Sequence, residues 1–293
     1  MSAPAAIDEA LLRSMPLPVP AGDTDKDGRG RVLVIAGSTE VPGAVLLAGE
    51  AALRAGAGKL QLAVPTGVAV ALALAMPEAR VFALDHAGSG DPAPRAAEAL
   101  TSVDRCDAVL LGPGMLDEAA AAELTARVLN RAEGPAFVLD AAATSGLWDD
   151  PAPVHRHAGR IMLTPHFGEM ARMTGEAKAA LAADPADAAR RAAVRLKAVV
   201  ALKGQDTWVA TPDGSVWRHE DGPIGLATSG SGDVLAGLIT GLLARGASPL
   251  QAAAWGVWLH AQAGRRLSQR IGPLGFLARE LAAEAPALMA AFV

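Results

Sequence analysis

The sequence is poor in cysteine and in aromatic residues. Among its 293 residues there is one cysteine, Cys106, there is no tyrosine, and aromatic residues make up 3%. A single cysteine excludes an intrachain disulfide framework and a zinc site built from several cysteines. Cys106 comes just before the apolar run Ala108 to Leu111, which favours a small buried hydrophobic residue over a nucleophile.

The sequence also has no basic block and no long apolar run. The net charge is -5 and charges of both signs are interspersed, so nothing offers a footprint for nucleic acid or an anionic membrane. No segment has about 18 uninterrupted apolar residues, so no membrane span is expected. Asp8 and Glu9, followed by Pro16, Pro18 and Pro20, are unlike a secretion signal. We therefore expect a cytoplasmic protein with small-molecule ligands.

The remaining composition is suited to a large core. Hydrophobic residues make up 51% of the chain and the mean hydropathy is +0.27. Strand-like runs cover residues 31–36, 60–64, 108–111, 136–139, 161–163 and 199–202, and a hairpin is expected at 208–217. Helix-like runs cover residues 44–55, 117–131, 233–244 and 249–267. This alternation, with continuous apolar strands, predicts an α/β fold whose mainly parallel sheet carries helices on both faces.

The domain organisation follows from the same pattern. Residues 1–27 are expected to be an N-terminal arm with a helix from Ile7 to Arg13, and residues 28–293 one domain. Nearly every unusual residue lies just after a predicted strand. Because ligands of open parallel sheets bind outside the carboxyl ends of the strands, this placement predicts an enzyme.

The most informative segment is Ser229-Gly230-Ser231-Gly232-Asp233, at a junction between a loop and a helix. Small residues let the backbone approach a bulky anion, and the free N–H groups and positive dipole end of the helix favour a phosphate there. Asp233 has two interpretations. It could be an ordinary N-cap, or a general base that takes a proton from a substrate hydroxyl beside the phosphate site.

At this segment the chain resembles the ribokinase-like superfamily, and further blocks narrow the resemblance to the NAD(P)H-hydrate dehydratases. The blocks are Gly37-Ser38 with Pro42-Gly43-Ala44, Ala52 to Gly58, Gly112-Pro113-Gly114, Leu163 to His166 with Gly168-Glu169-Met170, and Lys203 to Thr207. They occur in the family's order and extend from about residue 28 to 280. The ordered set is specific, although any one block is not.

The resemblance implies an activity and a site. Family members use ADP or ATP, with Mg²⁺ on the phosphates, to dehydrate the hydrated, damaged form of NADH or NADPH. The residues that would bind the nucleotide are Lys203, Gly204, Gln205, Asp206, Thr207, Gly230, Ser231 and Gly232. The residues that would bind the hydrated dinucleotide are Ala44, Gly114, His166 and Asp233. Asp233 would activate the ring hydroxyl for phosphorylation, and loss of phosphate would regenerate the double bond.

Several of these residues also have structural interpretations. His166 alone would be a structural histidine, but within its block a hydrogen bond to the substrate is the better interpretation. Lys203 could be a solvated lysine, and Glu169 is expected to open the following helix rather than bind a metal. Asp140, at a strand end, would help to organise the magnesium and phosphate region. The remaining histidines that we assign to the surface are His86, His155, His157 and His219.

The chain departs from the family pattern at a few positions. Ala142 stands where a second aspartate is common, Thr144 where a leucine is, and Phe167 where a proline follows the histidine. Gly222-Pro223-Ile224 replaces an asparagine ahead of the Gly-Leu-Ala-Thr run. These changes fall outside the anion loop and the base. They bear on metal arrangement and nucleotide preference, and less on the reaction class.

Two other functions fit part of the pattern. A ribokinase-like kinase of a small hydroxymethyl or hydroxyethyl heterocycle would share the loop and Asp233 but release a phosphorylated product. A non-catalytic nucleotide-binding protein would have no need of a base at that position. The sequence does not choose between ADP and ATP, or between hydrated NADH and NADPH. The resemblance implies a homo-oligomer, such as a tetramer.

Overall fold

One mixed sheet organises the chain. In residues 4–19 and 22–292, which the computed structural model describes, ten strands are hydrogen-bonded in the order β1-β10-β9-β8-β7-β6-β5-β2-β3-β4. The strands are β1 (Ala5–Ala6), β2 (Arg31–Ile35), β3 (Lys59–Pro65), β4 (Ala79–Leu84), β5 (Ala108–Leu111), β6 (Ala136–Leu139), β7 (Ile161–Leu163), β8 (Val199–Leu202), β9 (Thr207–Ala210) and β10 (Val216–His219). Of these neighbours, only β8–β9 and β9–β10 pair antiparallel, which confirms the expected mainly parallel sheet.

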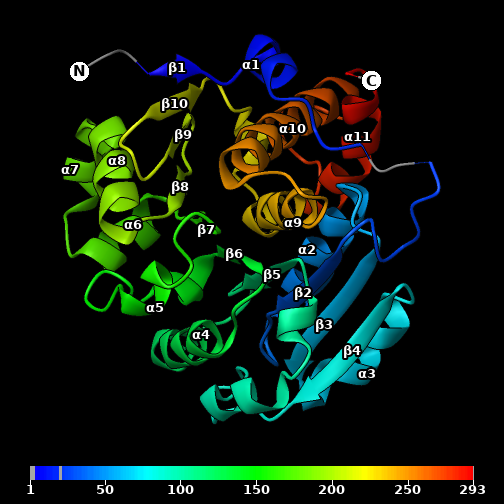
Figure 1. The fold of residues 1–293 in the computed structure, drawn as a ribbon. Coiled ribbons are helices and arrows are strands. Elements are labelled where there is room, and N and C mark those ends of the chain that lie inside the picture. The colour runs from blue at the N-terminus through cyan, green and yellow to red at the C-terminus, as the bar shows by residue number, and fades with distance from the viewer. Residues whose placement is uncertain (1–3, 20–21, 293) are drawn as a thin grey trace.

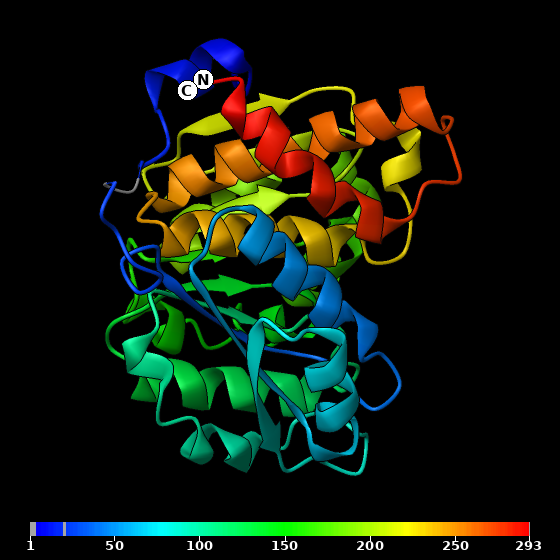
Figure 2. The ribbon, with the colours of Figure 1, turned by 90° about the vertical axis from the view of Figure 1, so that its right-hand side faces the viewer.

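Helices cover both faces of the sheet (Figure 1). They are α1 (Glu9–Ser14), α2 (Gly43–Arg54), α3 (Thr66–Ala75), α4 (Glu118–Arg131), α5 (Ala152–His155), α6 (Phe167–Thr174), α7 (Lys178–Ala183), α8 (Pro185–Leu196), α9 (Ser231–Ala244), α10 (Pro249–Arg270) and α11 (Ala278–Ala290). Figure 2 shows α2, α10 and α11 on one side of the sheet, and the green helix α4, at the bottom of the view, on the other side. Within the described ranges, no helix is long and apolar enough to cross a membrane.

Strand β2 shows why both faces must be covered. Successive side chains of a strand point to opposite faces, so an apolar run buries both. Val32 and Val34 pack in the core with α2, α9 and α10, whereas Leu33 and Ile35 pack in the second core with α4 and α8. All four side chains are fully buried. The expected fold class, an α/β sheet between two helical layers, is therefore confirmed.

Helices α2 and α9 approach each other unusually closely. A Cβ atom at Gly237 would lie 2.2 Å from the carbonyl oxygen of Ala48, and one at Gly241 would lie 2.3 Å from that of Ala52. Gly237 and Gly241 are four residues apart and so share one face of α9. Small residues on both helices therefore let α9, which begins at the glycine-rich loop, pack closely against α2.

The described residues ahead of β2 contact the sheet and α10. β1 extends the sheet by pairing with β10, and Trp255 Nε1 donates a hydrogen bond to the carbonyl oxygen of Met15 at 2.9 Å. The predicted helix is present but begins later, at Glu9, because Asp8 accepts from the Leu11 amide as an N-cap. Residues 1–3 and 20–21 of the predicted arm, Pro20 among them, and residue 293 of the predicted domain lie outside the described residues.

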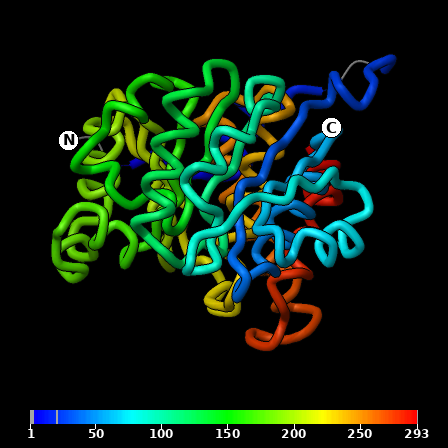
Figure 3. Tube along the Cα trace, turned by 90° about the horizontal axis from the view of Figure 1, so that it is seen from below, coloured from blue at the N-terminus to red at the C-terminus, as the bar shows by residue number. Residues whose placement is uncertain are grey.

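The predicted strands and helices are present at β2, β3, β5 to β8, the β9–β10 hairpin, α2, α4, α9 and α10. The prediction missed β1, α5, α7, α8 and α11. It also missed α3 and β4, and β4 is the strand at one edge of the sheet (Figure 3). In β4 only Leu84 is buried, so this strand lacks the continuously buried apolar run of the interior strands. Cys106 is buried, as expected.

Two histidines that we assigned to the surface are buried, and that expectation is wrong. His157 is 1% exposed and its Nε2 lies 2.8 Å from the carbonyl oxygen of Leu129. His219 is 7% exposed and its Nδ1 lies 2.9 Å from the carbonyl oxygen of Ile7. Because both carbonyl partners are remote in sequence, no local pattern marks these rings as buried. The other two histidines lie at or near the surface.

Candidate active site

The carboxyl ends of β6, β7 and β8 bring three polar side chains together. Asp140, Thr164 and Lys203 each follow one of these neighbouring parallel strands. Asp140 Oδ1 accepts from Lys203 Nζ at 2.8 Å and from Thr164 Oγ1 at 2.6 Å. Asp140 is 2% exposed, so its ion pair with Lys203 is buried. Removing either partner would leave a buried charge without compensation and would destabilise the protein. Residues far apart in sequence thus meet where parallel strands end.

His166 and Glu169 open α6 next to this pair. The amides of Gly168 and Glu169 donate to His166 Nδ1 at 2.8 and 3.1 Å, and the His166 amide donates to Glu169 Oε2 at 2.7 Å. This reciprocal capping confirms that Glu169 opens the helix. The same carboxylate lies 3.9 Å from Lys203 Nζ. Lys203 therefore faces two carboxylates, and the His166 ring remains half exposed.

The glycine-rich loop leads directly into α9. Gly230 is the N-cap, with φ of 86°, a left-handed conformation that favours glycine. The helix begins at Ser231, so Asp233 is its third residue and the N-cap interpretation of Asp233 is wrong. Gly232 lies beside Lys203, since a Cβ atom there would be 3.2 Å from Lys203 Nζ. The start of α9 and the lysine thus converge on one point, a suitable arrangement for a phosphate.

The charges at this point shift one another. Burial, together with the Asp140 carboxylate, raises the pKa of Asp233 to about 7, although Lys203 acts in the opposite direction. Burial alone would lower the pKa of Lys203, but the Asp140, Glu169 and Asp233 carboxylates outweigh it and raise that pKa. A carboxyl group with a pKa near neutrality is well matched to general base catalysis.

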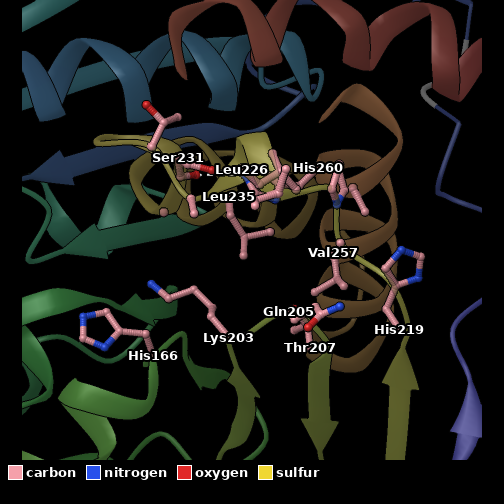
Figure 4. Close-up of a pocket in the computed structure, with 18 residues that line it drawn as sticks. His166, Lys203, Gln205, Thr207, His219, Leu226, Ser231, Leu235, Val257 and His260 are labelled. Carbon is pink, nitrogen blue, oxygen red and sulfur yellow. Dashed lines mark hydrogen bonds between the residues drawn. The ribbon is translucent and has the colours of Figure 1, made fainter. Parts of the chain in front are cut away.

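A cavity of about 700 Å³ opens beside these residues (Figure 4). Seven residues that the sequence predicted to bind the nucleotide or the dinucleotide line this cavity: His166, Lys203, Gly204, Gln205, Thr207, Ser231 and Gly232. The lining is completed by His219, Gly222, Pro223, Ile224, Leu226, Ala227, Thr228, Leu235, Val257, His260 and Ala261. The cavity has the size expected of a small-molecule site. It gathers six of the eight residues predicted to bind the nucleotide.

The other two residues predicted to bind the nucleotide lie apart from the cavity lining. Asp206 accepts from Arg218 Nη2 at 2.6 Å and from the Asp221 amide at 3.0 Å. It therefore holds the β9–β10 hairpin to the following loop. Gly230 packs on α2, because a Cβ atom there would be 2.4 Å from Leu47 Cδ1.

The residues predicted to bind the dinucleotide form a second group. A Cβ atom at Gly114 would lie 2.8 Å from the Cβ of Ala44, so these two positions touch. Asp233 lies close to Gly230, which packs on the same helix as Ala44. Only His166 of this set lines the cavity itself. The predicted residues thus divide between a cavity beside Lys203 and a small-residue surface on the α2 side.

Among the lining residues that sequence reasoning missed are two histidines. His219 and His260 both line the cavity, and burial lowers the pKa of His260 to about 4. His260 interrupts the apolar residues of α10, and a polar side chain within a buried stretch of helix is a usable signal. His219 offered no such signal, since its burial depends on the arm.

The departures from the family pattern have definite places. Phe167 packs on Gly204, where a Cβ atom would be 2.8 Å from Cε2 of the ring. Ala142 and Thr144 lie in a short 3-10 helix after Asp140, and Pro223 lines the cavity. Phe167 and Pro223 therefore shape the region around the cavity.

Comparison with known proteins adds to this geometry. A family model described as NAD(P)H-hydrate dehydratase matches residues 32–287. The ADP-dependent (S)-NAD(P)H-hydrate dehydratase of Xanthomonas campestris pv. campestris is 51% identical over 285 residues, which cover 97% of this chain and 95% of that protein. The crystal structure of the ADP/ATP-dependent NAD(P)H-hydrate dehydratase from Bacillus subtilis, co-crystallized with ATP/Mg²⁺, matches with a TM-score of 0.85 at 30% identity, covering 100% of both chains.

A more distant structure bears on the fold alone. A ribokinase-like superfamily protein from Enterococcus faecalis matches with a TM-score of 0.79 at 23% identity, over 98% of this chain and 96% of that one. The fold is therefore ribokinase-like. Taken with the match over residues 32–287 and the 51% identical relative, the chain belongs to the NAD(P)H-hydrate dehydratase family.

Proposed function

We propose that this protein dehydrates hydrated NADH or NADPH at the expense of ADP or ATP. The observation that carries the proposal is Asp233, a carboxyl group with a pKa of about 7 in the first turn of α9, beside Lys203. Membership of the NAD(P)H-hydrate dehydratase family favours this reaction over phosphorylation of a heterocycle and over a purely binding role. ADP is the nucleotide of the Xanthomonas relative, and we propose it as the first nucleotide to test.

The nucleotide is assigned to the cavity. Its phosphates would lie against the N-terminus of α9 and Lys203, and its nucleoside would extend along Gly204, Gln205 and Thr207. Helix N–H groups and a lysine are complementary to phosphate charge. The hydrated dinucleotide is assigned to the α2 side, against Ala44 and Gly114, with its ring near Asp233 and His166.

The proposed chemistry proceeds in two steps. Asp233 accepts the proton of the ring hydroxyl while the hydroxyl oxygen attacks the terminal phosphorus, and ADP leaves from ATP or AMP from ADP. The phosphorylated ring then loses phosphate together with a neighbouring ring proton, and the electrons of that C–H bond form the double bond. Phosphate is a far better leaving group than hydroxide, which explains why a dehydration would require a nucleotide.

Magnesium is proposed to arrive on the nucleotide. In the part of the chain that the structure describes, no group of three or more His, Cys, Asp or Glu side chains could hold a metal ion. The Asp140 carboxylate beside Lys203 is a donor of the kind that suits Mg²⁺, which proteins usually bind through one or two carboxylates and substrate phosphates. Asp140 would help to organise the metal and the phosphates, whereas Glu169 opens α6. When bound, Mg²⁺ neutralises phosphate charge during transfer.

The decisive experiment is a spectroscopic assay. Purified protein is mixed with hydrated NADH or NADPH, Mg²⁺, and ADP or ATP, and the near-ultraviolet absorbance of the dihydronicotinamide ring is followed. Recovery of that absorbance with release of inorganic phosphate is the expected result. No recovery with either nucleotide, combined with turnover of a hydroxymethyl heterocycle to a stable phosphate ester, would establish the kinase instead.

We propose that the enzyme works in the cytoplasm as a homo-oligomer such as a tetramer, with residues 1–27 as an arm on a single domain over residues 28–293. Support for association comes from α3, which carries no charged residue and exposes Val70 at 74% and Leu74 at 80%. Exposed apolar clusters of this kind mark interaction surfaces.

A further inference from the structure

His260 occupies a distinctive place in the cavity wall. It lies on α10 and reaches the first residue of α9, where its Nε2 is 3.0 Å from the backbone oxygen of Ser231 and 2.9 Å from the Ser231 hydroxyl. Figure 4 shows His260, Val257 and His219 at the end of the cavity away from His166 and Lys203. The ring is thus fixed at one edge and faces the cavity with the other.

The bond to Ser231 determines the tautomer of the ring. A carbonyl oxygen can only accept, so His260 Nε2 must carry the hydrogen. Burial lowers the pKa of His260 to about 4, so the ring is neutral at physiological pH and Nδ1 keeps its lone pair. Among the described residues, none forms a hydrogen bond with Nδ1. Nδ1 is also absent from the set of buried side-chain nitrogen and oxygen atoms that lack a partner, so the protein does not enclose it. Nδ1 is therefore an open hydrogen-bond acceptor in the cavity.

The surroundings indicate what would donate to it. The phosphate end of the cavity is set by Lys203 and Gly232. Around His260 the wall is apolar, with Leu226, Val257 and Ala261. An ionised phosphate has no hydrogen-bond donor for Nδ1, and an apolar wall does not compensate its charge. The nucleoside does offer donors, in the amino group of adenine and in the ribose hydroxyls, and its base suits apolar walls.

We propose that His260 is a specificity-determining residue for the nucleotide, accepting at Nδ1 a hydrogen bond from the amino group of the base or from a ribose hydroxyl. This inference rests on the proposed function only in placing an adenine nucleotide in the cavity. A site built to pair a donor rejects analogues without that donor, because its acceptor would be left unpaired. His260 thereby selects the nucleoside while Lys203 and α9 hold the phosphates.

Two substitutions separate the two edges of the ring. In His260→Asn the side-chain oxygen can take the place of Nδ1, so the acceptor is kept and the bond to Ser231 is lost. In His260→Gln the amide nitrogen can take the place of Nε2, so the bond to Ser231 is kept and the acceptor is lost. His86→Gln, at an exposed histidine outside the cavity, is the matched control.

The experiment measures the dissociation constants of ADP, inosine diphosphate, 2′-deoxy-ADP and 3′-deoxy-ADP by calorimetry, without any dinucleotide. His260→Gln should weaken ADP binding about tenfold and should remove the preference for ADP over one of the analogues. The analogue that loses its disadvantage identifies the donor: inosine diphosphate the amino group, a deoxy analogue the ribose. His260→Asn should bind ADP more tightly than His260→Gln does.

Other results would overturn the inference. If His260→Gln binds ADP as tightly as the unmodified protein, or more tightly than His260→Asn, the histidine serves to hold Ser231. The same conclusion follows if no analogue changes its relative affinity in His260→Gln. Thermal unfolding of each variant shows whether it is folded. If the unmodified protein binds neither ADP nor ATP, the proposed function fails, which is a different outcome.

Discussion

At the scale of single residues, the site is a compromise among buried charges. Asp140 and Lys203 form a buried pair at 2.8 Å, and Asp233 adds a further carboxyl group beside them. Three carboxylates around one lysine cannot all be neutralised by it. Burial is the main cause of the raised pKa of Asp233, and the repulsion from the Asp140 carboxylate, which protonation of Asp233 relieves, adds to it. Substrate and nucleotide therefore meet a carboxyl group that is ready to exchange a proton near neutral pH.

Asp233 is the residue on which the proposed catalysis depends. Asp233→Asn should lower turnover by about 100- to 10,000-fold while nucleotide affinity changes little, because the base is lost and the phosphate cradle is kept. In the unmodified enzyme, kcat/KM should rise with pH and level off above about 7, where the Asp233 carboxylate is ionised. Steady-state rates across pH, with ADP binding by calorimetry, check both. A near-normal rate in Asp233→Asn would remove this residue from the role of base.

Stability provides the control for this substitution. An aspartate in the unfolded chain loses its proton near its ordinary pKa of 3.8, whereas folded Asp233 keeps its proton to about pH 7. The unfolded state thus binds fewer protons in that window, and this residue destabilises the fold progressively as pH rises through it. Asp233→Asn should therefore raise the free energy of unfolding at pH 8, on the order of a few kcal/mol, and have little effect near pH 4. Denaturant unfolding at both pH values shows whether lost activity reflects lost structure.

At the scale of elements, the contact between α2 and α9 positions the anion loop. Alanine is a better helix former than glycine by about 1 kcal/mol. At Gly237, however, a Cβ atom would meet the Ala48 backbone at 2.2 Å. Backbone cannot yield as a flexible side chain can, so the two helices would have to separate. The start of α9 would then move relative to Lys203.

Gly237→Ala should therefore destabilise the protein by about 1–3 kcal/mol, because overpacking outweighs the gain in helix propensity. Gly67→Ala in α3, where a Cβ atom would be 3.8 Å from the Thr39 side chain, should be neutral or stabilising by up to about 1 kcal/mol. Chemical denaturation of both variants measures the free energy of unfolding. Equal stabilities for the two variants would mean that α2 and α9 tolerate a wider spacing.

At the scale of the whole molecule, the exposed face of α3 predicts association. Val70 and Leu74 are exposed and lie four residues apart, on one face of the helix. Charges there should disrupt an interface between copies and should leave the fold intact, since neither side chain packs in the core. The double variant Val70→Glu, Leu74→Lys should have a smaller mass in solution than the unmodified protein.

Sedimentation velocity of both proteins makes the measurement. Val194→Glu on α8, another exposed valine, is the control and should leave the mass unchanged. If the double variant keeps the mass of an oligomeric parent, α3 lies outside the interface. If the parent itself sediments as a monomer, the homo-oligomer proposal fails.

Local patterns were enough to predict much of this protein. The continuous apolar runs that become β2, β5, β6 and β8 must be buried on both faces wherever they lie, so they predict a parallel sheet between helices. The segment from Ser229 to Asp233 predicts a phosphate site. Small residues ahead of a helix let an anion approach the free N–H groups at the helix N-terminus in any fold. The ordered blocks, from Gly37 to Thr207, then narrowed the resemblance of the chain from a superfamily to one family.

The tertiary structure decided what depends on distance between remote residues. Asp140 and Lys203 are 63 positions apart in sequence, and only the order of neighbouring strands makes them a buried pair. The raised pKa of Asp233 depends on its burial and on the Asp140 carboxylate, and its place in the third position of α9 follows from Gly230. His219 is buried because the N-terminal arm supplies a carbonyl to it, and the tautomer of His260 depends on Ser231. The electrostatic and hydrogen-bonding environment of a residue depends on groups that are close in space but remote in sequence, so local sequence patterns do not predict it.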